Sequence, residues 1–306
     1  MSADLAEKEK AGRMMRRATL FAVAVGVILI VAKLTAWLGT GSVALLSTLI
    51  DSTLDSIASL VNLLAVHHAL SPADAEHRFG HGKAEPLAGL AQSAFIGGSG
   101  LLLIGEAAQR LWEPQPVTHG LGGIAVMGLS IVLTLALVTY QKRVIARTQS
   151  VAISADRLHY ASDLMMNAGV IVSLLLSAHL GWTFIDPLFA LGIACYILWG
   201  AGKLAWGSFN LLMDREFPPE DRSRIKAICE AHPFVRNVHD LRTRSAGQAD
   251  FIQLHLVLDG EMSLRRAHDI SDAVEAEIRA AFPRADIIIH QDPDGLAEPR
   301  KDFDEE

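Results

Sequence analysis

Six long apolar segments constrain the fold of this 306-residue chain more than any other feature. A helix needs about 20 apolar residues to cross roughly 30 Å of hydrocarbon, and six segments meet that length. They cover approximately residues 17–38, 43–68, 84–112, 119–140, 151–179 and 184–211. The sequence therefore predicts a polytopic α-helical membrane protein, with six transmembrane helices in a domain that covers residues 17–213.

The connections between these segments differ in charge, and the difference predicts the orientation. Lys and Arg occur in "KEKAGRMMRR", "PADAEHRFGHGK" and "QKRVIARTQ", whereas "GTGS", "EPQPVTHG" and "AHLGW" contain neither. Positively charged loops stay on the cytoplasmic side, so we expect residues 1–16 to be a cytoplasmic segment and both termini and the two charged loops to face the cytoplasm. The first apolar run is too long for a cleaved signal peptide, and further spans follow it.

The charge of the chain changes near "LLMDREFPPEDR". Residues 1–213 hold 14 Lys and Arg against 13 Asp and Glu, whereas residues 214–306 hold 13 against 21. Pro218 and Pro219 also interrupt any helix that continues from the last apolar segment. The sequence therefore predicts that a soluble domain follows the membrane domain.

Hydrophobic periodicity gives this soluble domain, residues 214–292, an αββαβ order. The expected elements are a helix over 219–231, strands in "VHDLRTRSA" and "DFIQLHLVLD", a helix over 263–282 and a strand in "ADIIIHQ". Two helices over one face of a small sheet form an α+β domain. The charged residues 293–306, which include Pro and Gly, are expected to be disordered. Cys195 and Cys229 lie too far apart for a CxxC motif, so neither a disulfide framework nor a thiolate metal site is expected.

Two pairs of ionisable residues stand out within the apolar segments. Asp51 and Asp55 are four residues apart in "LIDSTLDSIASLVN", and His159 and Asp163 repeat this spacing in "DRLHYASDLMMN". An ionised Asp at the membrane centre costs about 2.5 to 3.5 kcal/mol, so something must offset it. Residues at i and i+4 share a helix face, so two such helices can offer four donors to one ion. This donor set suits zinc, cadmium, ferrous iron or manganese, and it argues against copper(I).

Structural roles are the alternative for each pair taken alone. An Asp can bond a neighbouring serine such as Ser52 or Ser56, and an isolated His often forms an interhelical hydrogen bond. Both pairs in one six-span chain favour a metal role. A purely structural membrane protein has no reason to carry both.

Four further polar residues in the spans are assigned no metal role. Lys33, near the outer end of the first span, is expected to extend its ammonium group to the interface. Asp156 is expected to be a solvated residue near the cytoplasmic end of its span. Asn62 and Asn167 are interpreted as helix-packing residues, with a supporting role beside the ligands as the alternative.

Two more clusters of candidate ligands lie outside the spans. Asp74, His77 and His81 in the loop "PADAEHRFGHGK" form either a metal site with room for water or ordinary polar residues. The soluble domain contains a larger set of candidate ligands, more than we expect in a small α+β domain whose histidines are only structural. Its members are His239, His255, His268, His290 and Asp292. We interpret it as a metal-binding set in which Asp292 can bridge two ions, with ordinary surface histidines as the alternative.

The chain resembles the cation diffusion facilitator family, and in particular its bacterial ferrous-iron/zinc efflux branch. The resemblance rests on "LIDSTLDSIASLVN", "HRFGHGKAEPLAGLAQS", "DRLHYASDLMMN", "LLMDRE" and "HDLRTR". It implies a homodimer with six spans and a cytoplasmic αββαβ domain like that of metallochaperones or ferredoxins. It also implies export of divalent metal in exchange for protons.

Carried over by motif match, the resemblance also implies roles for individual residues. The implied transport site comprises Asp51, Asp55, His159 and Asp163. The implied loop site comprises Asp74, His77 and His81. The implied binuclear site at the cytoplasmic dimer interface comprises His239, His255, His268, His290 and Asp292. Lys83 and Asp214 would form a salt bridge that stabilises the dimer near the membrane surface.

The sequence thus predicts a secondary active transporter and not an enzyme. Zn(II) is the expected cargo and regulatory ligand, with Cd(II), Fe(II) and Mn(II) as further candidates for the physiological metal. The expected partners are metal ions, protons, the lipid bilayer and a second copy of the chain, without an organic cofactor or nucleic acid. The rival functions are an intramembrane metal-dependent hydrolase, which would need an HExxH helix that the sequence lacks, and a metal-gated channel, which would need polar residues along several spans.

Overall fold

The computed structural model describes residues 2–41, 43–112, 121–180, 185–247 and 249–295. The chain forms two compact units, Met1–Phe209 and Asn210–Glu306, and each is described by itself. Part of the segment predicted to be disordered, residues 296–306, lies outside the described residues, as do the connections at 113–120 and 181–184.

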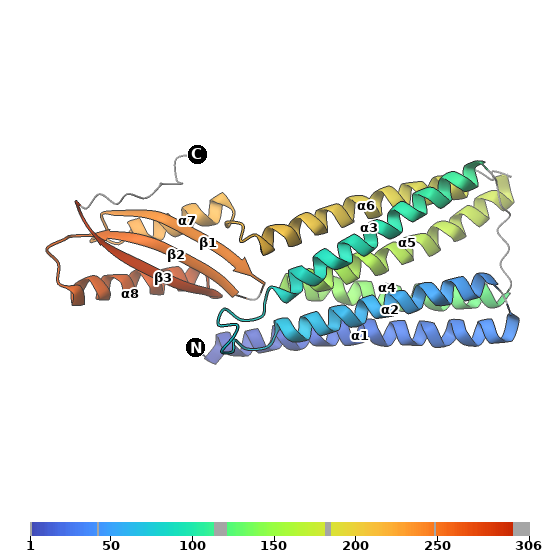
Figure 1. Ribbon diagram of the computed structural model, residues 1–306, viewed down its shortest axis with the longest axis horizontal. Coiled ribbons are helices and arrows are strands. Elements are labelled where there is room, and N and C mark those ends of the chain that lie inside the picture. Colours follow the sequence, from blue (N-terminus) through green and yellow to red (C-terminus); the bar gives the residue numbers. More distant parts are fainter. Residues whose placement is uncertain (1, 42, 113–120, 181–184, 248, 296–306) are drawn as a thin grey trace. The chain divides into compact units, whose positions relative to one another are not determined.

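Long helices make up the N-terminal unit (Figure 1). Their bounds are α1 Ser2–Thr40, α2 Val43–Ala69, α3 Ala84–Trp112, α4 Leu121–Thr148, α5 Val151–Leu180 and α6 Ile185–Leu212. α1 packs against α2 and α4, and α5 packs against α3 and α4 and also touches α2. The two helices that carry the candidate ligand pairs, α2 and α5, are therefore neighbours.

Five of these helices are long and apolar enough to cross a membrane over their described residues, and α5 is the exception. Its described part carries three charged residues, Asp156, Arg157 and Asp163. The apolar surfaces of the other helices are largely open, since at most a third of each span is buried in the chain itself. This is the pattern of helices whose outer faces contact lipid or a second copy.

The C-terminal unit is a three-stranded sheet with two helices. The elements are α7 Pro219–Glu230, β1 Asn237–Ala246, β2 Ala249–Leu258, α8 Leu264–Ala281 and β3 Ala285–Pro293. The strands lie in the order β1-β2-β3, with β1 antiparallel and β3 parallel to β2. The parallel pair is possible because α8 provides the crossover between β2 and β3.

Strand alternation gives this sheet two different faces. Ile252, Leu254 and Leu256 of β2 are fully or almost fully buried, and they form one core with Val274 and Ile278 of α8. The intervening residues of β2, such as His255, point to the opposite face.

The core also holds Cys229, and burial raises the pKa of its thiol to about 12. This thiol therefore stays protonated at neutral pH.

The ordered part of the domain continues slightly beyond residue 292. β3 includes Pro293, and the backbone N–H of Asp294 donates to the carbonyl of Leu258. Arg236 forms ion pairs with Asp259 and Asp294, which raise the pKa of the guanidinium. The predicted disorder of residues 293–306 therefore does not hold for the first two of them.

Candidate functional site

The structure gathers three of the predicted intramembrane ligands between α2 and α5. Nε2 of His159 lies 2.9 Å from Oδ1 of Asp55 and 3.8 Å from Oδ2 of Asp163. One donor atom from each residue lies within 4.8 Å of the others, which is the spacing of groups that share an ion. The His159 side chain is 8% exposed, whereas Asp163 is 38% exposed, so the cluster is open on one side.

Asp51, the fourth predicted ligand, lies one helical turn before Asp55 on α2. It is exposed in the single chain, and its carboxylate is not part of the close group of described ligand atoms. Two residues four apart on a helix have side chains about one turn apart, so a rotamer change of Asp51 can bring its carboxylate toward Asp55. Its role as a ligand stays a prediction.

Asp156 is not solvated, and that prediction was wrong. The residue is 1% exposed, and its carboxylate accepts hydrogen bonds from Gln141 of α4 at 2.6 Å, from Ser59 of α2 at 2.9 Å and from Asn62 of α2 at 3.5 Å. Tyr160, one turn along α5, lies 3.0 Å from the same Ser59 hydroxyl. Three helices are thus joined at one buried carboxylate, one turn from His159.

The helix-packing role predicted for Asn62 is confirmed. Its side-chain amide donates to the carbonyl of Ala152 on α5 at 3.3 Å. The same role for Asn167 stays a prediction. A hydrogen bond between one of the paired aspartates and a neighbouring serine was the alternative to a metal role. Ser56 does not form it, because its hydroxyl donates to the carbonyl of Ser52.

The side chain of Lys33 bonds to α2, whereas the sequence predicted that its ammonium group extends to the membrane interface. Its Nζ donates to Oγ of Ser52 at 2.6 Å and to the carbonyl of Thr48 at 3.1 Å. Ser52 is 4% exposed and stands between Asp51 and Asp55 in the sequence. The ammonium group is therefore held beside the turn of α2 that carries the acidic pair.

The loop between α2 and α3 brings Asp74, His77 and His81 together. The Asp74 carboxylate lies 3.4 Å from Nδ1 of His77 and 3.3 Å from Nε2 of His81, and one donor atom from each residue falls within 4.8 Å of the others. Backbone N–H groups of His77 and Glu76 donate to Asp74 at 2.6 and 3.0 Å. These bonds hold the pKa of Asp74 below its usual range, so the carboxylate stays ionised and available as a ligand.

His68, at the end of α2, also reaches the loop cluster. Its ring centroid lies 4.4 Å from that of His81, and His81 is 4.7 Å from His77. Sequence reasoning passed over His68 because it belongs to a helix end and not to the loop motif. The adjacent pair "HH" just before the loop was the available signal.

Strand register explains how the second cluster forms in the C-terminal unit. His239 of β1 pairs with His255 of β2, and His255 pairs with His290 of β3, so three histidines lie side by side across the sheet. The Asp292 carboxylate lies among them, 3.3 Å from His239, 2.7 Å from His255 and 3.1 Å from His290. His239, His255 and Asp292 meet the distance condition for a shared ion.

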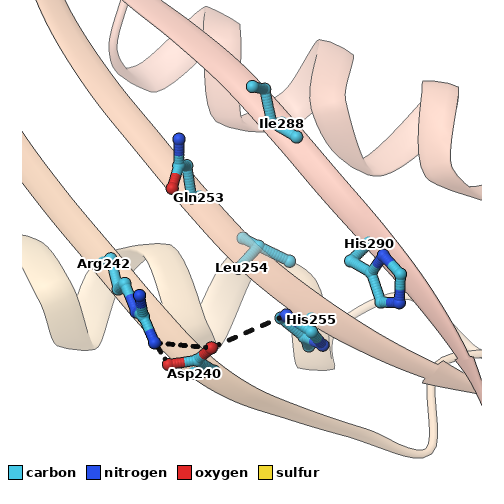
Figure 2. A pocket seen from close by; sticks show the side chains of 7 residues that line it. All are labelled: Asp240, Arg242, Gln253, Leu254, His255, Ile288 and His290. Atoms are coloured by element: carbon cyan, nitrogen blue, oxygen red, sulfur yellow. Dashed lines mark hydrogen bonds and ion pairs between the residues drawn. The ribbon is translucent and has the colours of Figure 1, made fainter.

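An open pocket of about 470 Å³ borders this cluster on the exposed face of the sheet (Figure 2). Its lining includes His255 and His290 and also Asp240, whose carboxylate lies 3.6 Å from Nε2 of His255 and 2.9 Å from Arg242. Asp240 has a positive φ of 50° at an irregularity where the register between β1 and β2 shifts. The sequence pattern did not reveal Asp240 because strict alternation places it on the other face from His239.

Two further predictions concern His268 and the pair of Lys83 and Asp214. His268 lies on the exposed side of α8, where it faces Asp272 at 3.6 Å, and it is not part of the cluster around Asp292 among the described residues. Asp214 faces Arg244 at 3.4 Å. Lys83 and Asp214 belong to different units, so their salt bridge stays a prediction.

Comparison with known proteins identifies the family. Residues 19–213 match the family described as cation efflux transmembrane domain, and residues 217–294 match that described as cation efflux protein, cytoplasmic domain. The chain belongs to the cation diffusion facilitators. The resemblance inferred from the sequence motifs is thereby confirmed, and this facilitator is a multi-pass membrane protein with a cytoplasmic α+β domain.

Curated relatives share most of the length of this facilitator. It is 50% identical to the cation-efflux pump FieF of Shewanella oneidensis, over 91% of this chain and 94% of the relative. It is 48% identical to FieF of Klebsiella pneumoniae, over 93% and 95%. A solved structure of CzrB in its zinc form is 36% identical, with a TM-score of 0.27, over 28% of this chain and 99% of that one. The relatives are named as pumps and not as enzymes, which decides against the hydrolase alternative.

Proposed function

We propose that this facilitator exports Zn(II) from the cytoplasm in exchange for protons, with Cd(II) and Fe(II) as further cargoes. The observation that carries the proposal is the cluster of Asp55, His159 and Asp163 between two helices of the membrane domain. Carboxylate and imidazole donors suit zinc, and a buried cluster of this charge needs a cation to offset its cost. Asp51 would complete the transport site by a rotamer change.

Proton exchange follows from the chemistry of these donors. Each ligand must be deprotonated to coordinate a metal, so metal binding and proton binding exclude one another. His159 suits the role of proton carrier, because imidazole exchanges protons in the physiological pH range. In an alternating-access cycle the site takes metal from the cytoplasm, opens outward and exchanges it for protons, which avoids an empty site with three bare carboxylates.

The remaining expectations form part of the same proposal. The domain bounds are 1–16, 17–213, 214–292 and 293–306, with both termini on the cytoplasmic side of a bacterial inner membrane. The α+β domain would resemble a metallochaperone and would join two copies of the chain. The ligands in this domain would hold a binuclear zinc site at the interface between the copies: His239, His255, His268, His290 and Asp292. The loop ligands Asp74, His77 and His81 would bind a further ion, and Lys83 would pair with Asp214.

Proteoliposomes with an imposed pH gradient test the transport proposal. Wild-type protein should move zinc at a rate that rises with the gradient, whereas a metal-gated channel would not require it. Asp55→Ala should reduce this flux by at least tenfold, because it removes a central donor of the cluster. Asp269→Asn, which changes an exposed carboxylate of α8, is the matched control and should retain full flux. Zinc and proton exchange that persists in Asp55→Ala would rule out the site.

A further inference from the structure

Lys33 has no role in the transport mechanism proposed above, although its side chain lies beside the acidic pair of α2. Its Nζ is fixed by two hydrogen bonds to α2, one to Ser52 at 2.6 Å and one to the carbonyl of Thr48 at 3.1 Å. Gly26 of α1 permits the close approach of the two helices, because a Cβ there would clash with Oγ of Ser56. The packing of α1 on α2 thus places the ammonium group of Lys33 beside the acidic turn.

The electrostatic partners of this charge are the predicted ligands themselves. The ammonium group interacts attractively with Asp55, Asp163 and Asp51. An ammonium ion has three N–H donors and no lone pair, so it acts here as a fixed charge and not as a ligand. Lys33 can therefore influence the metal only through the field that it adds to the site.

Charge balance shows what this field does. Among the proposed ligands alone, the ionised carboxylates of Asp51, Asp55 and Asp163 and one divalent cation carry a net charge of −1, and the ammonium group of Lys33 brings this set to zero. A net charge inside a membrane protein is costly, so the neutral combination is favoured. Without Lys33 the same carboxylates would attract a dication more strongly and would release it more slowly.

We propose that Lys33 determines the affinity of the transport site, by matching three carboxylates to one divalent cation and by weakening binding enough for release. The inference rests on the proposed function, because it requires the carboxylates to be the transport ligands. A purely structural role is the competing account, in which only the hydrogen bonds to Ser52 and Thr48 matter. When the charge is removed, the charge-balance account predicts tighter zinc binding, whereas the structural account predicts unchanged or weaker binding.

Calorimetric titration of the purified full-length protein with zinc separates them. The binding component that disappears in Asp55→Ala reports the membrane site and excludes the loop and cytoplasmic ligands. In Lys33→Gln, which loses the charge but keeps a hydrogen-bond donor, this component should bind zinc at least tenfold more tightly. Lys33→Met should bind more tightly as well, and Lys33→Arg should stay within about threefold of the wild type. A tenfold change corresponds to about 1.4 kcal/mol.

Transport measurements on the same variants complete the test. Tighter binding should slow release, so the maximal zinc flux of Lys33→Gln should fall while its half-saturating zinc concentration decreases. If Lys33→Gln binds zinc as the wild type does or more weakly, the charge-balance proposal is overturned. If the wild type itself has no component that depends on Asp55, the proposed transport site is wrong instead. If Lys33→Met does not fold, Lys33→Gln and Lys33→Arg still decide the question.

Discussion

At the scale of single residues, the buried carboxylate of Asp156 should contribute to stability because it joins three helices. Asp156→Ala would leave the buried Gln141 donor without its acceptor, and it would remove one partner each from Ser59 and Asn62, which keep Tyr160 and the carbonyl of Ala152. Unsatisfied buried donors cost roughly 1 to 3 kcal/mol each before relaxation, so we expect a loss of about 3 kcal/mol. Thermal unfolding in detergent measures this as a lower Tm, with Asp269→Asn as the control. An unchanged Tm would mean that water replaces the carboxylate at no cost.

The ionisation of Asp74 predicts a pH dependence in the loop. Because its folded-state pKa is lowered, the stability it contributes is present above its ordinary pKa of about 3.9 and is lost as the pH falls through the folded value. Exchange protection of the His77 and Glu76 amides should therefore be constant from pH 5 to 8 after correction for the intrinsic rate. Hydrogen exchange by mass spectrometry should show this protection disappear in Asp74→Ala. Equal protection in the variant would contradict the role of the carboxylate.

At the scale of elements, helix packing depends on small residues at particular positions. A Cβ at Gly89 of α3 would lie 2.7 Å from both Val151 of α5 and Ser208 of α6, whereas a Cβ at Gly98 would meet nothing within 4 Å. Gly89→Ala should therefore destabilise the bundle by about 1 to 3 kcal/mol. Gly98→Ala should be neutral or stabilising, because alanine is the better helix former. A comparison of Tm values in one detergent measures the difference, and equal values would contradict the packing.

The positions of helices and strands were predicted from the sequence more accurately than the contacts between them. Apolar length predicted the positions of all six long helices, five of which are long and apolar enough to cross a membrane over their described residues. Alternation predicted the three strands within a few residues. The i, i+4 spacing placed His159 and Asp163 on one face of α5, because helix geometry fixes which residues share a face, and the structure brings this pair together with Asp55 of α2. Spacing failed for Asp156, whose burial depends on Gln141 of another helix, and for Asp240, whose backbone leaves the regular strand. Contacts between elements and local irregularities have no periodic signal in the sequence.

At the scale of the whole molecule, the acidic charge of the chain resides almost wholly in residues 214–306. Two such domains repel each other unless cations lie between them. The ligands around Asp292 would let zinc offset this repulsion in the proposed dimer, so cytoplasmic zinc would also set the activity of the transporter. Sequence alone located these ligands, but only strand register shows that His239, His255 and His290 form one row.

His255→Ala tests this coupling in the intact protein. It removes the histidine at the centre of the row, which lies 2.7 Å from Asp292, and leaves the membrane ligands unchanged. The zinc concentration that gives half-maximal transport should rise by about tenfold, with the maximal rate at saturating zinc preserved, because only the regulatory ligand is weakened. Flux into proteoliposomes across a zinc titration measures both quantities, and His232→Ala provides a control outside the row. A half-maximal concentration equal to that of the wild type would show that the cytoplasmic cluster does not regulate transport.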